Sequence, residues 1–296
     1  MRIFITKLLS ILMIAAFFSS CAEKEDLEIK MPDNASKIVT LGGTMTEIIY
    51  ALGVEDRLVG TDLSSNYPEA AEKTNKVGIW RNVTPESIIG LVPDLVIAMP
   101  DSGPDETLKK IWESKIPVYK PERDYSYAWT RSVIDSIGSL TGNAAKADSI
   151  IAELDRQMET LESRLENDTI SLTALFVYMR GGKALIVGGE GTTAAAALES
   201  ANLKNIAADM DDWTNVGPEY YASVDPDILV VPEQGLQTIG GLEALANTPG
   251  IGEMRAVKEG KVYVVNELAF LGFGPRYPRE LAKLLDFKES IININN

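Results

Sequence analysis

The sequence predicts an α/β protein with two lobes, each built on a parallel sheet, joined by a single long helix. Three observations support this fold class. Short apolar blocks alternate with helical segments along both halves of the chain, a motif in the first half recurs in the second, and one long amphipathic segment lies between them. The length of 296 residues is enough for two domains.

The first half alternates predicted strands with predicted helices. A strand at 38–41 is followed by a helix that Thr44 or Thr46 caps and that Gly53 ends. Apolar blocks bounded by Gly or Pro are typical of strands buried on both faces of a parallel sheet. The remaining elements are strands at 58–60, 94–99 and 116–119, and helices at 85–91 and 108–112.

A long helix is predicted between the halves, because no Gly or Pro interrupts 144–165 and apolar residues recur in steps of three and four. Such a helix is about 33 Å long, roughly the width of a domain. It separates a first lobe at 37–142 from a second lobe at 168–296, with the linker at 143–167. The second lobe is predicted to contain strands at 172–178, 184–187, 228–231 and 261–265, and helices at 193–198 and 278–285.

An internal repeat of the pattern W-x-N-V-x-P-E links the two halves. Each copy is followed, eight residues after its Pro, by Pro-Asp and an apolar strand. Repetition at one fixed offset indicates two lobes of one design. The copies are Trp80-Arg81-Asn82-Val83-Thr84-Pro85-Glu86 and Trp213-Thr214-Asn215-Val216-Gly217-Pro218-Glu219.

Trp80 and Trp213 are predicted to face one cleft from opposite lobes, because loops at the ends of parallel strands line the ligand crevice. Two indoles suit a large flat ligand. The alternative is that each indole fills the core of its own lobe. Glu86 and Glu219 begin predicted helices, where a carboxylate complements the helix dipole. An exposed carboxylate on each lobe also suits docking onto a symmetric basic partner.

The first residues indicate export. Arg2 and Lys7 precede an apolar run that ends in small residues before Cys21, as in a secretory signal. We interpret 1–20 as a signal peptide, Cys21 as a lipidated N-terminus and 21–36 as a flexible leash to a membrane. This places the protein in the cell envelope, outside the cytoplasm. The alternative is an ordinary signal peptide with an incidental Cys.

Composition excludes several functions. The chain has no His and one Cys, so imidazole metal sites, Ser-His-Asp triads and internal disulfides are excluded. A formal charge of −15 argues against nucleic acid as a partner. Carboxylates could serve acid–base chemistry, but no nucleophile or metal site accompanies them, so we do not expect an enzyme or a cofactor of its own.

Together these features resemble the substrate-binding proteins of ABC importers, in the class with two Rossmann-like lobes and one connecting helix that binds haem, cobalamin or iron–siderophores. The resemblance runs from Lys37 to Phe287. It implies an ABC permease dimer with ATPase subunits as partner, with Glu86 and Glu219 contacting arginines of the two permease subunits. The segments that carry the resemblance are 37–47, 77–86, 188–192 and 271–276. The last two segments are most like the haem-binding branch.

The resemblance leaves the ligand open. Haem-binding relatives have a Tyr where this chain has Ile79, whereas Trp80 matches the cobalamin branch. We expect haem first, a corrinoid second and an iron–siderophore third. Without His, iron ligation would fall to Tyr or Met, and Arg81 and Arg276 would pair with propionates or form surface or inter-loop salt bridges. The candidates for iron ligation are Tyr67, Tyr125, Tyr178 and Tyr277. The expected ligand-binding residues are Trp80, Arg81, Trp213, Arg276, Tyr178 and Tyr277.

Two other functions stay open: a surface lipoprotein that holds ligand without supplying an importer, and an enzyme that uses the same cleft. For an importer protein, the long helix predicts lobe closure of small amplitude, because bending it breaks helical hydrogen bonds.

Overall fold

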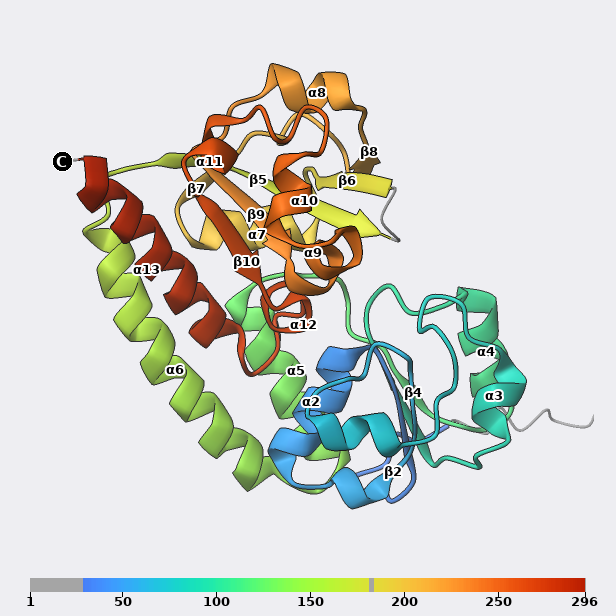
Figure 1. Cartoon of the computed structure of the whole chain (residues 1–296). Helices are drawn as coiled ribbons and strands as arrows, with labels where there is room; N and C mark the ends of the chain where they lie inside the picture. The colour runs from blue at the N-terminus through green and yellow to red at the C-terminus, as the bar shows by residue number, and fades with distance from the viewer. Residues whose placement is uncertain (1–28, 181–183, 296) are drawn as a thin grey trace, which may run out of the picture. The chain divides into compact units, whose positions relative to one another are not determined.

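A computed structural model describes residues 29–180 and 184–295 (Figure 1). One compact unit begins at Met31 and holds every element described here. The predicted signal peptide and Cys21 lie outside the described residues. The elements before the second sheet are β1 (Ile38–Leu41), α2 (Gly43–Leu52), η2 (Glu55–Arg57), β2 (Leu58–Thr61), η3 (Glu69–Lys73), α3 (Pro85–Ile89), β3 (Leu95–Ala98), α4 (Asp105–Glu113), β4 (Val118–Tyr119), α5 (Tyr127–Leu140) and α6 (Ala144–Glu166).

The first lobe contains a wholly parallel sheet in the order β2-β1-β3-β4, as predicted. All four residues of β1 and all four of β3 are buried, which is why these strands are continuous apolar blocks. Helix α2 ends at Gly53 in the left-handed conformation with φ 72°, which also confirms the predicted stop.

The linker helix α6 spans Ala144–Glu166 and matches its prediction, whereas α5 before it was missed. Gly138 allows these helices to pack closely, because a Cβ on this residue would lie 2.5 Å from the Ala147 Cβ. The Ser126 side chain caps α5 by accepting a hydrogen bond from the Trp129 N–H at 3.1 Å.

The second lobe holds the remaining elements. They are β5 (Leu172–Arg180), β6 (Ala184–Gly188), α7 (Thr193–Ser200), β7 (Leu203–Asn205), β8 (Trp213–Asn215), α8 (Pro218–Ser223), β9 (Ile228–Pro232), α9 (Glu233–Ile239), α10 (Leu242–Ala246), α11 (Arg255–Lys258), β10 (Val262–Val265), α12 (Glu267–Leu271) and α13 (Tyr277–Asn295).

The second sheet, ordered β10-β9-β5-β6-β8 with β7 on β5, is mixed rather than wholly parallel. β5 pairs in parallel with β7 and β9, but β6 runs antiparallel to both β5 and β8. Only three residues separate β5 from β6, and a parallel crossover needs a dozen or more. The short connection therefore makes this pair a hairpin.

One hydrophobic cluster spans both lobes, beside a separate cluster in each lobe. Ile48 and Ile97 of the first lobe belong to the same buried cluster as Phe176 and Phe270 of the second. α13 runs beside α6 (Figure 1) and is held there by Arg164, whose Nη2 lies 2.8 Å from Asp286 Oδ1. α13 extends the helix predicted at 278–285 to Asn295. Among the described helices, none has the length and apolar character needed to cross a membrane.

The last residues of the predicted leash are attached to the first lobe. Ala35 is 1% exposed and its N–H donates to the Leu140 carbonyl at 2.9 Å. The Ser36 hydroxyl donates to Asp94 at 2.7 Å. Contacts with the lobe thus begin before residue 37.

Candidate ligand-binding site

A cavity of about 880 Å³ lies where loops of both lobes meet. The first-lobe loops that line it follow the carboxyl ends of β1, β2, β3 and β4, which is where parallel sheets bind ligands. The second lobe contributes residues that follow β9 and β10 in the same way. The cavity volume is near the upper end for small-molecule sites, so the cavity suits a large ligand.

On the first-lobe side, the loop at Gly42 that lines the cavity is held by Asp62, which is fully buried. Its carboxylate accepts hydrogen bonds from the Gly42 N–H at 2.9 Å and the Ser65 hydroxyl at 2.7 Å. Gly42 has φ 103° and a Cβ there would lie 2.2 Å from the Met99 Cγ, so only glycine fits. This loop is therefore held rigidly at the edge of the cavity.

The repeated tryptophans both line this one cavity, Trp80 from the first lobe and Trp213 from the second. Both indoles are partly exposed. Trp213 contacts Phe176 and Tyr178 edge to face, with each pair of ring centroids 5.8 Å apart. These edge contacts hold the Trp213 ring in place.

Two arginines of the cavity share one carboxylate. Arg81 Nε donates to Asp101 Oδ2 at 3.1 Å, and Arg123 Nη2 lies 3.9 Å from the same oxygen. Each guanidinium also lies over a ring: Arg81 over Trp80 at 4.2 Å and Arg123 over Tyr125 at 5.6 Å. Asp101 therefore organises the cationic part of the site.

Two of the four candidate tyrosines line the cavity, Tyr125 and Tyr178. The Tyr178 hydroxyl donates to Glu267 Oε1 at 2.6 Å. Burial, followed by the nearby charge of Asp101, raises the pKa of Tyr125, so its phenol is neutral at physiological pH. Among the described residues, no group of three or more Cys, Asp or Glu side chains is arranged to hold a metal ion.

Arg276 and Tyr277 lie outside the cavity lining. Arg276 forms two hydrogen bonds with Glu47 of α2, at 3.0 and 2.9 Å, and lies 3.5 Å from the Tyr67 ring. Tyr277 is 1% exposed and stacks on Phe273. The segment that follows Leu271 thus joins the lobes, and Tyr67 belongs to this junction.

Further bonds between the lobes surround this ion pair. The Thr44 hydroxyl donates to the Gly272 carbonyl at 3.0 Å, and the Thr130 hydroxyl donates to the Phe273 carbonyl at 2.7 Å. Burial raises the pKa of Glu47 despite the opposing effect of Arg276. Glu47 and Arg276 form a largely desolvated pair at the junction, with side chains 5% and 19% exposed.

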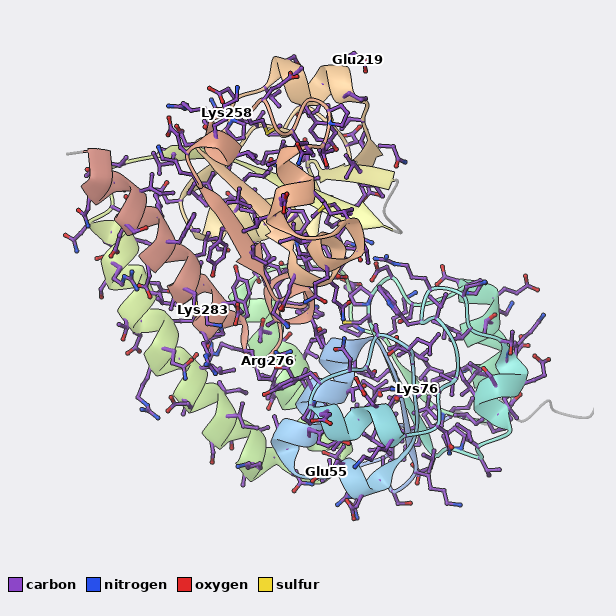
Figure 2. All side chains as sticks on the ribbon, in the orientation of Figure 1. Glu55, Lys76, Glu219, Lys258, Arg276 and Lys283 are labelled. Atoms are coloured by element: carbon purple, nitrogen blue, oxygen red, sulfur yellow. The ribbon has the colours of Figure 1, made fainter. Side chains whose placement is uncertain are left out.

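Glu86 and Glu219 are exposed in the first turns of α3 and α8. Pro85 and Pro218 occupy the first helical position in both, so the sequence repeat corresponds to a structural one. Figure 2 shows Glu219 pointing away from α8 into solvent. Neither carboxylate has an ion pair within the described residues.

Sequence reasoning missed Asp62, Asp101, Arg123 and Glu267 as parts of the site. A signal was available for three of them, because each closely follows a predicted apolar strand: Asp62, Asp101 and Glu267. Arg123 lies four residues after the predicted strand at 116–119 and therefore carries a weaker signal of the same kind.

The arrangement of two sheets around a cavity matches a known family. The profile of the family described as periplasmic binding protein matches residues 38–268. The chain belongs to this family. An uncharacterized ABC transporter substrate-binding lipoprotein of Bacillus subtilis, YvrC, is 29% identical over 260 residues, which cover 86% of this chain and 80% of the relative.

Two further relatives of the family differ in ligand. A vitamin B12-binding protein of Yersinia pestis is 25% identical over 198 residues, covering 67% of this chain and 69% of that protein. The solved structure of the periplasmic heme-binding protein RhuT from Roseiflexus sp. RS-1, in its apo form, has a TM-score of 0.81 and 28% identity, covering 87% of this chain and 99% of RhuT.

These matches confirm the fold class and the resemblance inferred from the sequence. The protein is a substrate-binding protein of an ABC transporter, in the class that takes haem, vitamin B12 and siderophores. Proteins of this family bind substrates for transport and are not enzymes. Membership implies a small-molecule ligand and permease and ATPase partners, and points to an extracytoplasmic location.

Proposed function

We propose that this protein captures a tetrapyrrole between Trp80 and Trp213 and delivers it to an ABC permease. The observation that carries the proposal is that two indoles, 133 residues apart in a sequence repeat, line one cavity from two lobes. Flat macrocycles are the ligands that paired indoles hold best, since ring stacking adds roughly 0.5–1.5 kcal/mol per pair to the burial of apolar area.

Among tetrapyrroles, the charges of the cavity favour a corrinoid. Five acidic residues and two arginines are among those that line the cavity, and both guanidinium groups face Asp101. A corrinoid carries amide-terminated side chains, which donate hydrogen bonds to carboxylates. Haem carries two propionates, which an excess of negative charge in the lining would repel. The five are Asp62, Asp101, Asp212, Glu233 and Glu267.

The preference for a corrinoid over haem reverses the order of ligands expected from the sequence, in which haem came first. Haem remains the second candidate because Tyr125 and Tyr178 place phenol oxygens in the lining and RhuT is a heme-binding protein. Ile79 lines the cavity. The haem-binding proteins that this sequence resembles have a Tyr at that position, so its absence here weakens the case for haem.

An absorbance and calorimetric titration of the purified protein with cyanocobalamin and haemin tests the proposal. We expect cyanocobalamin to bind with one site and to co-elute with the protein in gel filtration. A tighter complex with haemin and a shifted Soret band would replace the corrinoid by haem. Binding of neither compound would contradict the tetrapyrrole proposal as a whole.

We propose that Cys21 carries the lipid that anchors the protein to a membrane.

We propose that Glu86 and Glu219 dock onto basic residues of the two permease subunits. Glu86→Lys or Glu219→Lys places like charges together, which costs enough to reduce uptake at least about tenfold in a reconstituted transport assay. Ligand affinity should stay at the wild-type value. Glu159→Lys, an exposed charge reversal on α6, serves as the control. Loss of ligand binding in the two docking variants would refute this role.

A further inference from the structure

The two guanidinium groups of the cavity are both directed at one acceptor. Asp101 Oδ2 accepts a hydrogen bond from Arg81 Nε at 3.1 Å and lies 3.9 Å from Arg123 Nη2. The Asp101 side chain is 19% exposed, whereas the two arginines are about half exposed, at 48% and 49%. The carboxylate is thus less exposed than the arginines, and their charge is partly neutralised before any ligand arrives.

The rings beneath the arginines restrict them further. Arg81 lies over Trp80, the indole we assign to ligand stacking, and Arg123 lies over Tyr125. Turning either guanidinium toward an anionic group of a ligand would weaken both its ion pair with Asp101 and its contact with a ring. An incoming carboxylate would also meet the negative charge of Asp101 itself.

We propose that Asp101 is a specificity-determining residue that selects against tetrapyrroles with free carboxylates and in favour of those whose side chains are uncharged amides. This inference rests on the proposed function, because it concerns the choice among ligands of that cavity. Asp101 acts through Arg81 and Arg123: it occupies the cations that propionates would otherwise bind.

The test compares Asp101→Asn with the wild type for three probes: cyanocobalamin, haemin and haemin dimethyl ester, in which both propionates are masked. Asn keeps the shape and one acceptor oxygen but removes the charge. We expect the ratio of haemin affinity to cyanocobalamin affinity to rise at least about tenfold, with a smaller rise for the ester, since the gain requires a ligand carboxylate. The gain for haemin should shrink as salt rises.

Two further variants separate this role from bulk charge or altered folding. Asp105→Asn removes the same charge from an exposed position outside the cavity, where Asp105 pairs with Lys120, and should leave the ratio unchanged. Arg81→Gln in the Asp101→Asn background should remove most of the haemin gain. The inference would be overturned if Asp105→Asn changed the haemin-to-cyanocobalamin affinity ratio as much as Asp101→Asn does, or if Asp101→Asn left that ratio unchanged. The proposed function would still stand in either case, provided that the wild type binds cyanocobalamin. Failure of the wild type to bind any probe would overturn the proposed function itself.

Discussion

Trp80→Ala and Trp213→Ala are each expected to weaken tetrapyrrole binding by about 2 kcal/mol, roughly 30-fold in Kd, because a large aromatic side chain in a ligand cavity carries stacking as well as apolar burial. Isothermal titration with cyanocobalamin and with haemin measures the loss. Trp80→Phe and Trp213→Phe should retain most of the affinity, since a ring remains to stack.

Trp112→Ala is the matched control for these variants. Trp112 is 38% exposed on α4 and does not line the cavity, so its removal tests the loss of an indole without the loss of a ligand contact. Wild-type affinity in both Trp80→Ala and Trp213→Ala would contradict the stacking role. A loss confined to one of them would show that the ligand is held by a single lobe.

The elements that the sequence predicted well are those with local signals. An apolar block predicts β1, and the glycine at position 53 predicts the end of α2. An uninterrupted apolar face predicts α6. α5 was missed because its apolar face includes Gly138 and several β-branched residues, which lower helix propensity. Its helical conformation is stabilised by packing against α6, which a local pattern does not reveal.

The sequence repeat predicted that two indoles would face one cavity. Trp80 and Trp213 were found because both halves carry the same motif, and both indoles line the cavity. Arg276 was expected either at the ligand or in a salt bridge, and the structure shows a salt bridge to Glu47, 229 residues away. A pairing of this kind leaves no trace in either segment alone, since each looks like an ordinary charged residue beside an apolar stretch.

The junction between the lobes bears on how the protein would move. Separating the lobes widely would expose the shared core around Ile48 and Phe270 and break the hydrogen bonds of Thr44 and Thr130. These costs add to that of bending α6, so the small-amplitude closure predicted from the helix gains independent support. Comparison of the free and ligand-bound forms by small-angle scattering would measure it.

The largest expected effect on stability is that of Arg276→Leu. Glu47 would then be a buried carboxylate without its partner, and breaking a buried ion pair on one side costs about 3–5 kcal/mol. Replacing both members, in Glu47→Leu with Arg276→Leu, should be less destabilising than the single change, because no unpaired charge remains. Urea denaturation at pH 7.5 measures both variants.

The dependence of this loss on pH follows from Glu47. Burial already holds its pKa above the ordinary value of 4.5, and removing Arg276 removes the two largest effects that lower it. A carboxyl whose pKa is higher in the folded protein stabilises the fold when protonated, and this stabilisation is lost as pH rises through the folded pKa. The deficit of Arg276→Leu relative to the wild type should therefore be smaller at pH 5 than at pH 7.5.

Arg164→Leu is the control for this pH dependence. Arg164 pairs with Asp286 and Glu289, whose side chains are 68% and 57% exposed, so its loss should change stability by less than about 1 kcal/mol. Its deficit should also lack the recovery at pH 5, because both carboxylates are solvated without their partner. An Arg276→Leu variant as stable as Arg164→Leu at pH 7.5 would mean that water reaches Glu47 and that the ion pair does not hold the lobes together. A large deficit that is equal at both pH values would place the effect in lost packing against Tyr67 instead of in the unpaired charge.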